Sequence, residues 1–145
     1  MKSKFIQLLV LVAVAATISS CCSCRKPATR PPMASITASQ WQLVQMDGVT
    51  VKPTGDSFTL AFAENNMVSG KGDCNRLTGS FKNNGADGTL SFGTLASSRM
   101  FCPDQAAEDK FLRLLNEIDG YSIDGSMLML MSNGKLSMIF EKAGK

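Results

Sequence analysis

Two cysteines, Cys74 and Cys102, constrain this chain more than any other pair of its residues. Each lies in a short stretch that also carries an arginine, residues 70–81 around the first and residues 95–103 around the second. A bond between them would close a loop of about 30 residues, which contributes roughly 3–4 kcal/mol of stability in chain-entropy estimates. The pair is not a Cys-x-x-Cys motif, the spacing typical of thiol oxidoreductases. We therefore expect a structural disulfide that cross-links a small β-rich domain.

A reactive thiol is the alternative role for either cysteine. A nucleophilic cysteine needs an activating neighbour, such as a histidine or the N-terminus of a helix. The chain has no histidine, but Cys102 directly precedes the start of a predicted helix. Thiol trapping of the native protein would separate a thiol oxidoreductase from a protein with a structural disulfide.

The start of the chain has the pattern of a secretory signal. Lys2 and Lys4 are followed by an apolar stretch, residues 5–18. This stretch is short for a transmembrane helix, which takes about 20 apolar residues, although an uncleaved anchor is the alternative. Its length is typical of a cleaved signal peptide. We predict that residues 1–20 are this signal and that the mature chain lies outside the cytoplasm, where disulfides persist.

The signal ends in Ile18-Ser19-Ser20-Cys21, which resembles the lipobox of bacterial lipoproteins. The resemblance implies that the thiol of Cys21 is acylated and that the chain is cut just before it. Cys22 is a rival acceptor, but it would place Ser19 at the aliphatic position, and cleavage without acylation is a further alternative. Each buried methylene of an acyl chain contributes about 0.8 kcal/mol to membrane binding. We therefore expect a protein held to a membrane by its N-terminal lipid.

A tether and one folded domain follow the signal. Residues 21–38 have the composition of a flexible tether, because Pro27, Pro31 and Pro32 disfavour both helix and sheet pairing. Residues 39–142 are the predicted domain. The whole chain has 145 residues, so the part after the signal has the size of a single domain.

Composition argues against several classes of function. The formal net charge of +3 falls close to neutral once Lys2 and Lys4 leave with the signal. Nucleic-acid binding takes a clustered basic face, so no nucleic-acid partner is expected. The absence of histidine removes the commonest general base and the commonest metal ligand. We expect a monomer with no metal, no cofactor and no catalytic residues.

The domain has the pattern of short strands joined by tight turns. Alternating apolar residues indicate the strands, and the Asp-Gly and Asn-Gly dipeptides at 47–48, 124–125 and 133–134 are strong hairpin signals. The predicted strands are 41–44, 49–52, 58–62, 67–71, 77–82, 89–92, 121–123, 127–131 and 136–141. Residues 127–131 are apolar on both faces, which predicts a central strand with one face under the helix and the other inside a barrel; a methionine-rich binding groove is the alternative.

One helix is predicted after Cys102. Apolar residues recur at i, i+4, i+7, i+8 and i+11, which gives the helix a single apolar stripe. They are Ala107, Phe111, Leu114, Leu115 and Ile118. Pro103 suits the first helical turn, and Asp119 with Gly120 suits the end. The charged residues of this segment, including Glu108 near its start, are expected to face solvent.

The residues around the two cysteines allow two interpretations. Arg76 and Arg99 could bind an anion or a partner's carboxylate, or each could bond to a backbone carbonyl or an acidic neighbour. Asn75 is expected to cap a turn through its side chain. Gly70 and Gly72 occupy alternate strand positions, which indicates a bulge or close backbone packing rather than a phosphate site.

These motifs resemble those of the META domain family, the HslJ-like proteins of the bacterial envelope. Residues 72–81, beginning Gly-Asp-Cys-Asn-Arg, resemble the first family motif, and residues 98–102, Ser-Arg-Met-Phe-Cys, resemble the second. Besides the cysteines, the motif positions are Gly72, Asn75, Arg76, Gly79, Arg99 and Met100. Trp41 with Leu43 resembles the usual opening of the family. Asp73 stands where many members have glycine, and Ser98 stands where they have threonine.

The resemblance implies both a fold and a function. The fold is α+β, with antiparallel strands curled into a partly closed barrel and one α-helix packed against it. The function is that of a non-enzymatic outer-membrane lipoprotein, at the periplasmic face or the cell surface, that supports envelope integrity or stress tolerance by binding an envelope protein or another component. A pilot-like or chaperone-like lipoprotein that binds a peptide of an outer-membrane partner is the alternative. The family offers no catalytic residues, so none are assigned.

Overall fold

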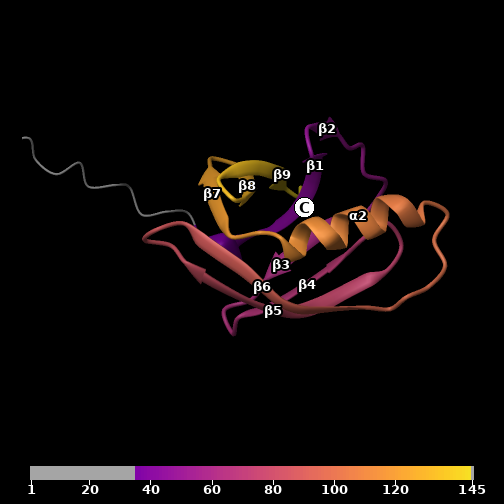
Figure 1. Cartoon of the computed structure of the whole chain (residues 1–145), viewed down its shortest axis with the longest axis horizontal. Helices are drawn as coiled ribbons and strands as arrows, with labels where there is room; N and C mark the ends of the chain where they lie inside the picture. The colour runs from indigo at the N-terminus through magenta and orange to yellow at the C-terminus, as the bar shows by residue number, and fades with distance from the viewer. Residues whose placement is uncertain (1–34, 145) are drawn as a thin grey trace, which may run out of the picture. The chain divides into compact units, whose positions relative to one another are not determined.

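The computed structural model of the protein describes residues 35–144, and nine strands there form one antiparallel sheet (Figure 1). The strand order is β2-β1-β3-β4-β5-β6-β7-β8-β9, and β1 also pairs with β9, so the sheet closes into a ring. The strands are β1 (Gln40–Met46), β2 (Val49–Thr50), β3 (Thr59–Phe62), β4 (Met67–Lys71), β5 (Arg76–Asn84), β6 (Thr89–Ser97), β7 (Gly120–Asp124), β8 (Met127–Ser132) and β9 (Lys135–Lys142). Within this part of the chain α2 (Gln105–Asn116) is the single α-helix. The predicted fold class is confirmed, although the ring is irregular rather than a regular barrel.

The ring has a weak joint between β6 and β7. These two strands share one pair of opposed residues, Thr89 and Gly120. Beyond that pair, from residue 91 to residue 97, β6 has a strand partner on one side only, β5, within the described chain. The helix α2 follows β6 in the chain and packs against it (Figure 1). We call the gap between β6 and β7 the seam.

Tight turns hold most of the hairpins in register. Asp47 and Gly48 both have positive φ, 52° and 76°, as do Asn133 and Gly134, 50° and 72°. Two consecutive residues of positive φ are what a two-residue hairpin turn of the common type requires, and the Asp-Gly and Asn-Gly dipeptides adopt it readily. The predicted β1–β2 and β8–β9 hairpins are therefore confirmed.

The strand β6 is longer than predicted and β2 is shorter. β6 continues past residue 92 because it pairs with β5 across a register shift between Gly79 and Phe81. A Cβ atom at Gly93 would overlap the Ser80 side chain, so the two strands cross closely at this bulge. A glycine and a polar residue here interrupt the alternation of apolar residues, so the sequence pattern did not predict this part of the strand.

The core fills the inside of the ring. Its fully buried side chains include Trp41, Leu43, Leu60, Phe111, Leu115, Leu128, Leu130, Met138 and Phe140. Phe58 and Phe111 meet edge to face with ring centroids 5.3 Å apart, which attaches α2 to the residue just before β3. The sheet thus supplies most of the core, and α2 supplies a stripe of apolar side chains, as its spacing predicts.

The strand β8 buries only one of its two apolar faces. It pairs with β7 and β9, as expected of a central strand. Leu128 and Leu130 are fully buried, whereas Met127, Met129 and Met131 alternate with them and are half-buried. The prediction that both faces lie inside the fold is wrong for the methionine face. The cavities described below lie around β4, β5, β6 and α2 instead.

The ends of α2 differ from the predicted ones. Asp104 is the N-cap, with its carboxylate accepting a hydrogen bond of 3.1 Å from the Ala107 N–H. Pro103 therefore lies just before the helix rather than in its first turn. The helix ends at Asn116, its C-cap Glu117 has a right-handed conformation, and Gly120 belongs to β7. The left-handed glycine cap is not used, because the chain turns directly into the strand beyond the seam.

The described chain begins within the predicted tether. Residues 36–38 form a short 3-10 helix, η1 (Ile36–Ala38), whose Ile36 is buried. The Trp41 indole N–H donates a buried hydrogen bond of 2.8 Å to the Ile36 carbonyl, which attaches this turn to the core. The predicted signal peptide and Cys21 lie outside the described residues. Between residues 35 and 144, no helix is long and apolar enough to cross a membrane.

Replacement of Lys110 by glutamine tests the placement of α2. Lys110 Nζ lies 2.9 Å from the Asp47 carboxylate in the β1–β2 turn, and this hydrogen bond lowers the pKa of Asp47. A carboxyl with a lowered pKa stabilises the fold above its unfolded pKa, about 4, and that contribution is lost as the pH falls through the folded pKa. We expect K110Q to raise the pKa of Asp47 in a carboxyl NMR titration.

Asp87 is the control for this titration. The pKa of Asp87 is lowered chiefly by a hydrogen bond from the Thr89 backbone N–H, which K110Q leaves in place. An unchanged pKa at Asp47, or an equal rise at both residues, would contradict the contact between α2 and the β1–β2 turn.

Candidate functional site

Cys74 and Cys102 form a disulfide. Cys74 lies in the turn between β4 and β5, and Cys102 lies just before α2; their Cα atoms are 5.9 Å apart and they are separated by 28 positions in the chain. The predicted disulfide is confirmed. It attaches the turn between two strands to the segment that leads from the seam into the helix.

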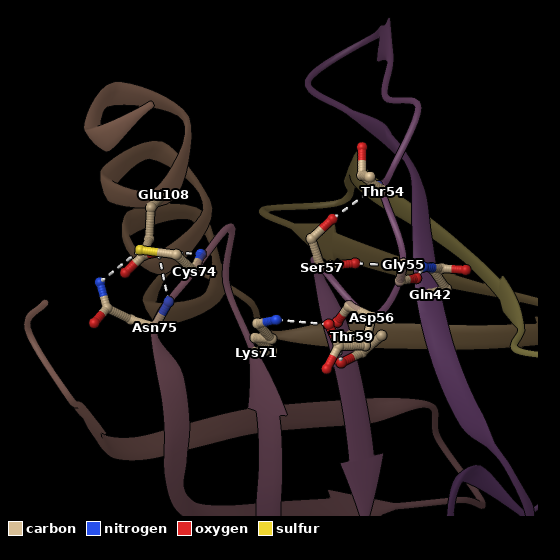
Figure 2. Close-up of polar contacts among 10 residues, drawn as sticks. All are labelled: Gln42, Thr54, Gly55, Asp56, Ser57, Thr59, Lys71, Cys74, Asn75 and Glu108. Carbon is tan, nitrogen blue, oxygen red and sulfur yellow. Dashed lines mark hydrogen bonds and ion pairs between the residues drawn. The ribbon is translucent and has the colours of Figure 1, made fainter. Parts of the chain in front are cut away.

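Glu108, on the first turns of α2, is the acidic centre of this region. Its side chain is 1% exposed, and its Oε2 accepts hydrogen bonds from the backbone N–H groups of Cys74, at 3.2 Å, and Asn75, at 3.1 Å (Figure 2). The same oxygen lies 3.3 Å from Cys102 Sγ, which carries no proton in the disulfide. The expectation that Glu108 faces solvent is wrong. It precedes the core residues Phe111 and Leu115 by three and seven positions, so helical spacing could have placed it on the buried face.

Gly72 makes room for the Glu108 carboxylate. A Cβ atom at Gly72 would lie 2.9 Å from the Glu108 side chain, closer than real contacts allow. The Gly72 carbonyl accepts from the Phe58 N–H at 2.8 Å, and its N–H donates to the Asn75 carbonyl at 2.8 Å. The predicted close backbone packing is found at Gly70, where a Cβ atom would overlap the Thr59 carbonyl, whereas at Gly72 a carboxylate side chain makes the close approach.

Asn75 joins the two motifs. Its side chain is buried, and its Nδ2 donates to the Met100 carbonyl at 3.0 Å. Its Oδ1 accepts from the Ser98 hydroxyl at 2.8 Å and from the Met100 N–H. The Asn75 side chain therefore does more than cap a local turn, because it holds residues 98–100 against the β4–β5 turn. We call Cys74, Asn75, Cys102 and Glu108 the polar cluster.

The polar cluster also contains the donor atoms of a possible metal site. One ligand atom from each of Cys74, Cys102 and Glu108 lies within 4.8 Å of the others. Thiolates, rather than disulfide sulfurs, bind metals. In this oxidised state the three residues are therefore held by the disulfide and by hydrogen bonds, and we assign them a structural role.

The side chains of the two motif arginines are exposed and make no hydrogen bond or ion pair within residues 35–144. The expectation that each bonds a carbonyl or an acidic neighbour is therefore wrong for Arg76 and Arg99. Arg76 lies beside Cys74 at a cavity of about 510 Å³ on β4 and β5, where Lys71 pairs with Asp56 at 2.6 Å (Figure 2). Arg99 has a positive φ of 53° and lines a different cavity.

That second cavity, of about 530 Å³, lies between α2 and the part of β6 that does not pair with β7. Its β6 wall is Leu95–Ala96–Ser97, and its helix wall includes Asp109, Leu112 and Asn116. Arg99 and Met100 line it where β6 leads into the loop before α2. We call it the seam groove.

Two large apolar side chains lie exposed in the loop that leaves the seam groove. Met100 is 56% exposed and Phe101 is 93% exposed. Both belong to the second motif, and the sequence predicts no role for Phe101. An aromatic residue between an arginine and a buried cysteine is not distinguishable by sequence from a core residue, so its exposure is a finding of the structure.

Removal of the Glu108 carboxylate tests the polar cluster. E108A leaves the Cys74 and Asn75 N–H groups without their acceptor, and each unsatisfied buried group costs about 1–3 kcal/mol. We expect a loss of roughly 2–5 kcal/mol in the free energy of unfolding, measured by urea denaturation with the disulfide intact. D109A removes an exposed carboxylate from the neighbouring helix position and should change stability by less than about 0.5 kcal/mol. Similar small losses in both variants would contradict the role of Glu108.

Comparisons with known proteins give a consistent result. Three solved structures share the fold. A protein known from an NMR structure has a TM-score of 0.60 at 21% identity, over 76% of this chain and 96% of the other. An NMR structure of a protein from Burkholderia xenovorans has a TM-score of 0.58 at 25% identity, over 76% and 85%. The crystal structure of a DUF4847 family protein from Bacteroides vulgatus has a TM-score of 0.57 at 18% identity, over 73% and 93%.

No protein of curated function matches the chain at comparable significance. The family model described as META domain matches residues 34–145, which includes every strand, the helix and both motifs of the structure. The chain belongs to the META domain family.

Proposed function

We propose that this protein is a non-enzymatic, lipid-anchored component of the bacterial cell envelope whose META domain acts by binding. The motif residues divide into two sets by what they contact. The polar cluster is engaged with itself and with the backbone. Arg99, Met100 and Phe101 are exposed instead, and Arg, Met and aromatic residues are the types enriched at interfaces. This exposed set is the observation that carries the proposal, because it favours recognition over chemistry.

The envelope location is supported by the sequence and by the chemistry of the cysteines. The predicted signal and the lipobox-like residues before Cys21 direct a chain to the membrane surface outside the cytoplasm. A disulfide between Cys74 and Cys102 suits an oxidising compartment of this kind. Attachment through an N-terminal lipid would leave the domain free to meet partners at the membrane.

A pilot-like or chaperone-like role is the second candidate, and the seam favours it. Such proteins bind an extended peptide of a larger partner, and an exposed strand edge is one of the recurring ways to do so. In the described chain β6 presents such an edge beside the seam groove. This candidate places the peptide site at β6 rather than at the methionine face of β8.

Replacement of Cys21 tests the lipid anchor. We expect cells given a labelled fatty acid to incorporate it into the wild-type protein and into C22S, but not into C21S. The C21S protein should also leave the membrane fraction, because the acyl chains supply the binding energy. Equal labelling of C21S and wild type, or no labelling of either, would contradict the proposed anchor.

A deletion strain tests the envelope role. The resemblance to the HslJ-like proteins implies tolerance of heat and novobiocin, so the deletion strain should grow less well under both. The wild-type gene should restore growth, and C21S should restore less of it. Unchanged growth of the deletion strain under both stresses would count against the role.

A further inference from the structure

The free edge of β6 is the feature from which we draw a further inference. In antiparallel pairs, residues alternate between those that exchange hydrogen bonds with the partner strand and those whose backbone groups point the other way. The Ser98 N–H donates to the Arg76 carbonyl of β5 at 3.1 Å. Ser98 therefore faces β5, as does Ala96, whereas Leu95 and Ser97 direct their N–H and C=O groups away from it.

These outward-facing backbone groups meet the seam groove. Leu95 and Ser97 both line it, and no hydrogen bond to their N–H or C=O groups on that side is found within residues 35–144. A row of unpaired backbone groups is a template for another strand. The groove beside these backbone groups has a volume of about 530 Å³.

The side chains beside this edge indicate what an added strand would carry. Three charged side chains line the groove. Glu108 accepts two backbone hydrogen bonds, and Asp109 accepts one of 2.9 Å from the Gln105 amide. Arg99 is the one cation among the three, and its guanidinium makes no hydrogen bond within the described chain. A carboxylate is therefore the group that complements it. The exposed Met100 and Phe101 lie next to it in the chain and offer an apolar contact.

We infer that β6 binds an extended segment of a partner polypeptide as an additional strand in the seam groove. Backbone hydrogen bonds to Leu95 and Ser97 hold the segment, an acidic side chain of the segment pairs with Arg99, and an apolar side chain packs on Met100 and Phe101. This inference rests on the proposed binding function and assigns it a site and a ligand chemistry. The partner segment is thus an extended peptide in which acidic and apolar residues alternate, rather than a helix or a small molecule.

The test uses a defined probe and the purified protein with its disulfide intact. The probe is a fluorescent peptide of about ten residues, a common strand length, in which valine alternates with glutamate; the control peptide has lysine in place of glutamate. We expect saturable binding of the glutamate peptide by fluorescence anisotropy and at least tenfold weaker binding of the lysine peptide. R99Q should weaken binding of the glutamate peptide about tenfold, the size expected for one charge-assisted pair. F101A should also weaken it.

Two further variants distinguish strand pairing at the β6 edge from nonspecific apolar binding. L95P removes an N–H that points away from β5, a position where a strand tolerates proline, and it should abolish binding. L136A removes a side chain that is 47% exposed on β9 and should leave binding unchanged. If L95P fails to fold, amide exchange in the wild-type protein serves instead. The Leu95 and Ser97 N–H groups should exchange more slowly when the peptide is bound.

Three results with the peptide would overturn the inference. They are no binding of the glutamate peptide, binding that R99Q and L136A weaken equally, and binding that leaves exchange at Leu95 and Ser97 unchanged. Protection of these two amides in a dimer without peptide would show that a second copy of the chain occupies the edge, which also contradicts the inference. None of these results bears on lipid attachment at Cys21 or on the growth of the deletion strain, so failure here is distinguishable from failure of the proposed function.

Discussion

The buried carboxylate of Glu108 is the interaction on which the rest of this structure depends. A carboxylate 1% exposed is costly unless its charge is satisfied. Here it accepts hydrogen bonds from two backbone N–H groups of the β4–β5 turn. It also lies near the N-terminus of α2, where the helix dipole favours negative charge. The contact fixes the start of the helix against the sheet. The disulfide beside it and Asn75 then fix the loop that connects β6 to that helix.

The fixed helix explains why the ring has a seam. The chain leaves β6, passes through the polar cluster and returns as α2 beside β6, so the next strand cannot pair along its whole length. A single pair of residues joins β6 to β7 as a result. The strands on the other side accommodate the curvature at a bulge, where a Cβ atom at Gly79 would lie 2.7 Å from Leu95. Rigidity in the polar cluster and an open edge on β6 are therefore two consequences of one arrangement.

Much of the fold was predictable because it depends on local signals. The Asp47-Gly48 and Asn133-Gly134 turns set two hairpins, the helix stripe placed Phe111 and Leu115 in the core, and the cysteine pair formed the expected disulfide. The family resemblance supplied the curled sheet, which no local pattern contains.

The errors in prediction arise where tertiary contacts override a local preference. Glu108 is a good residue for an exposed helix face, and only the N–H groups of a turn 33 and 34 positions away draw it inside. Asn75 is a common turn residue, yet its partners lie in the other motif. The seam groove could not be predicted, because it depends on which strands fail to pair. Arg99 and Phe101 acquire a role only once that edge is seen.

Native-state hydrogen exchange of the Cys74 and Asn75 backbone amides tests this account most directly. If the Glu108 carboxylate holds the helix to the sheet, both amides should exchange only through global unfolding and belong to the slowest class in the protein, although they lie in a turn. In E108Q both amides should exchange much faster, whereas amides in β8 and β9 should still exchange only through global unfolding. Fast exchange of both amides in the wild-type protein would contradict the central role of this contact.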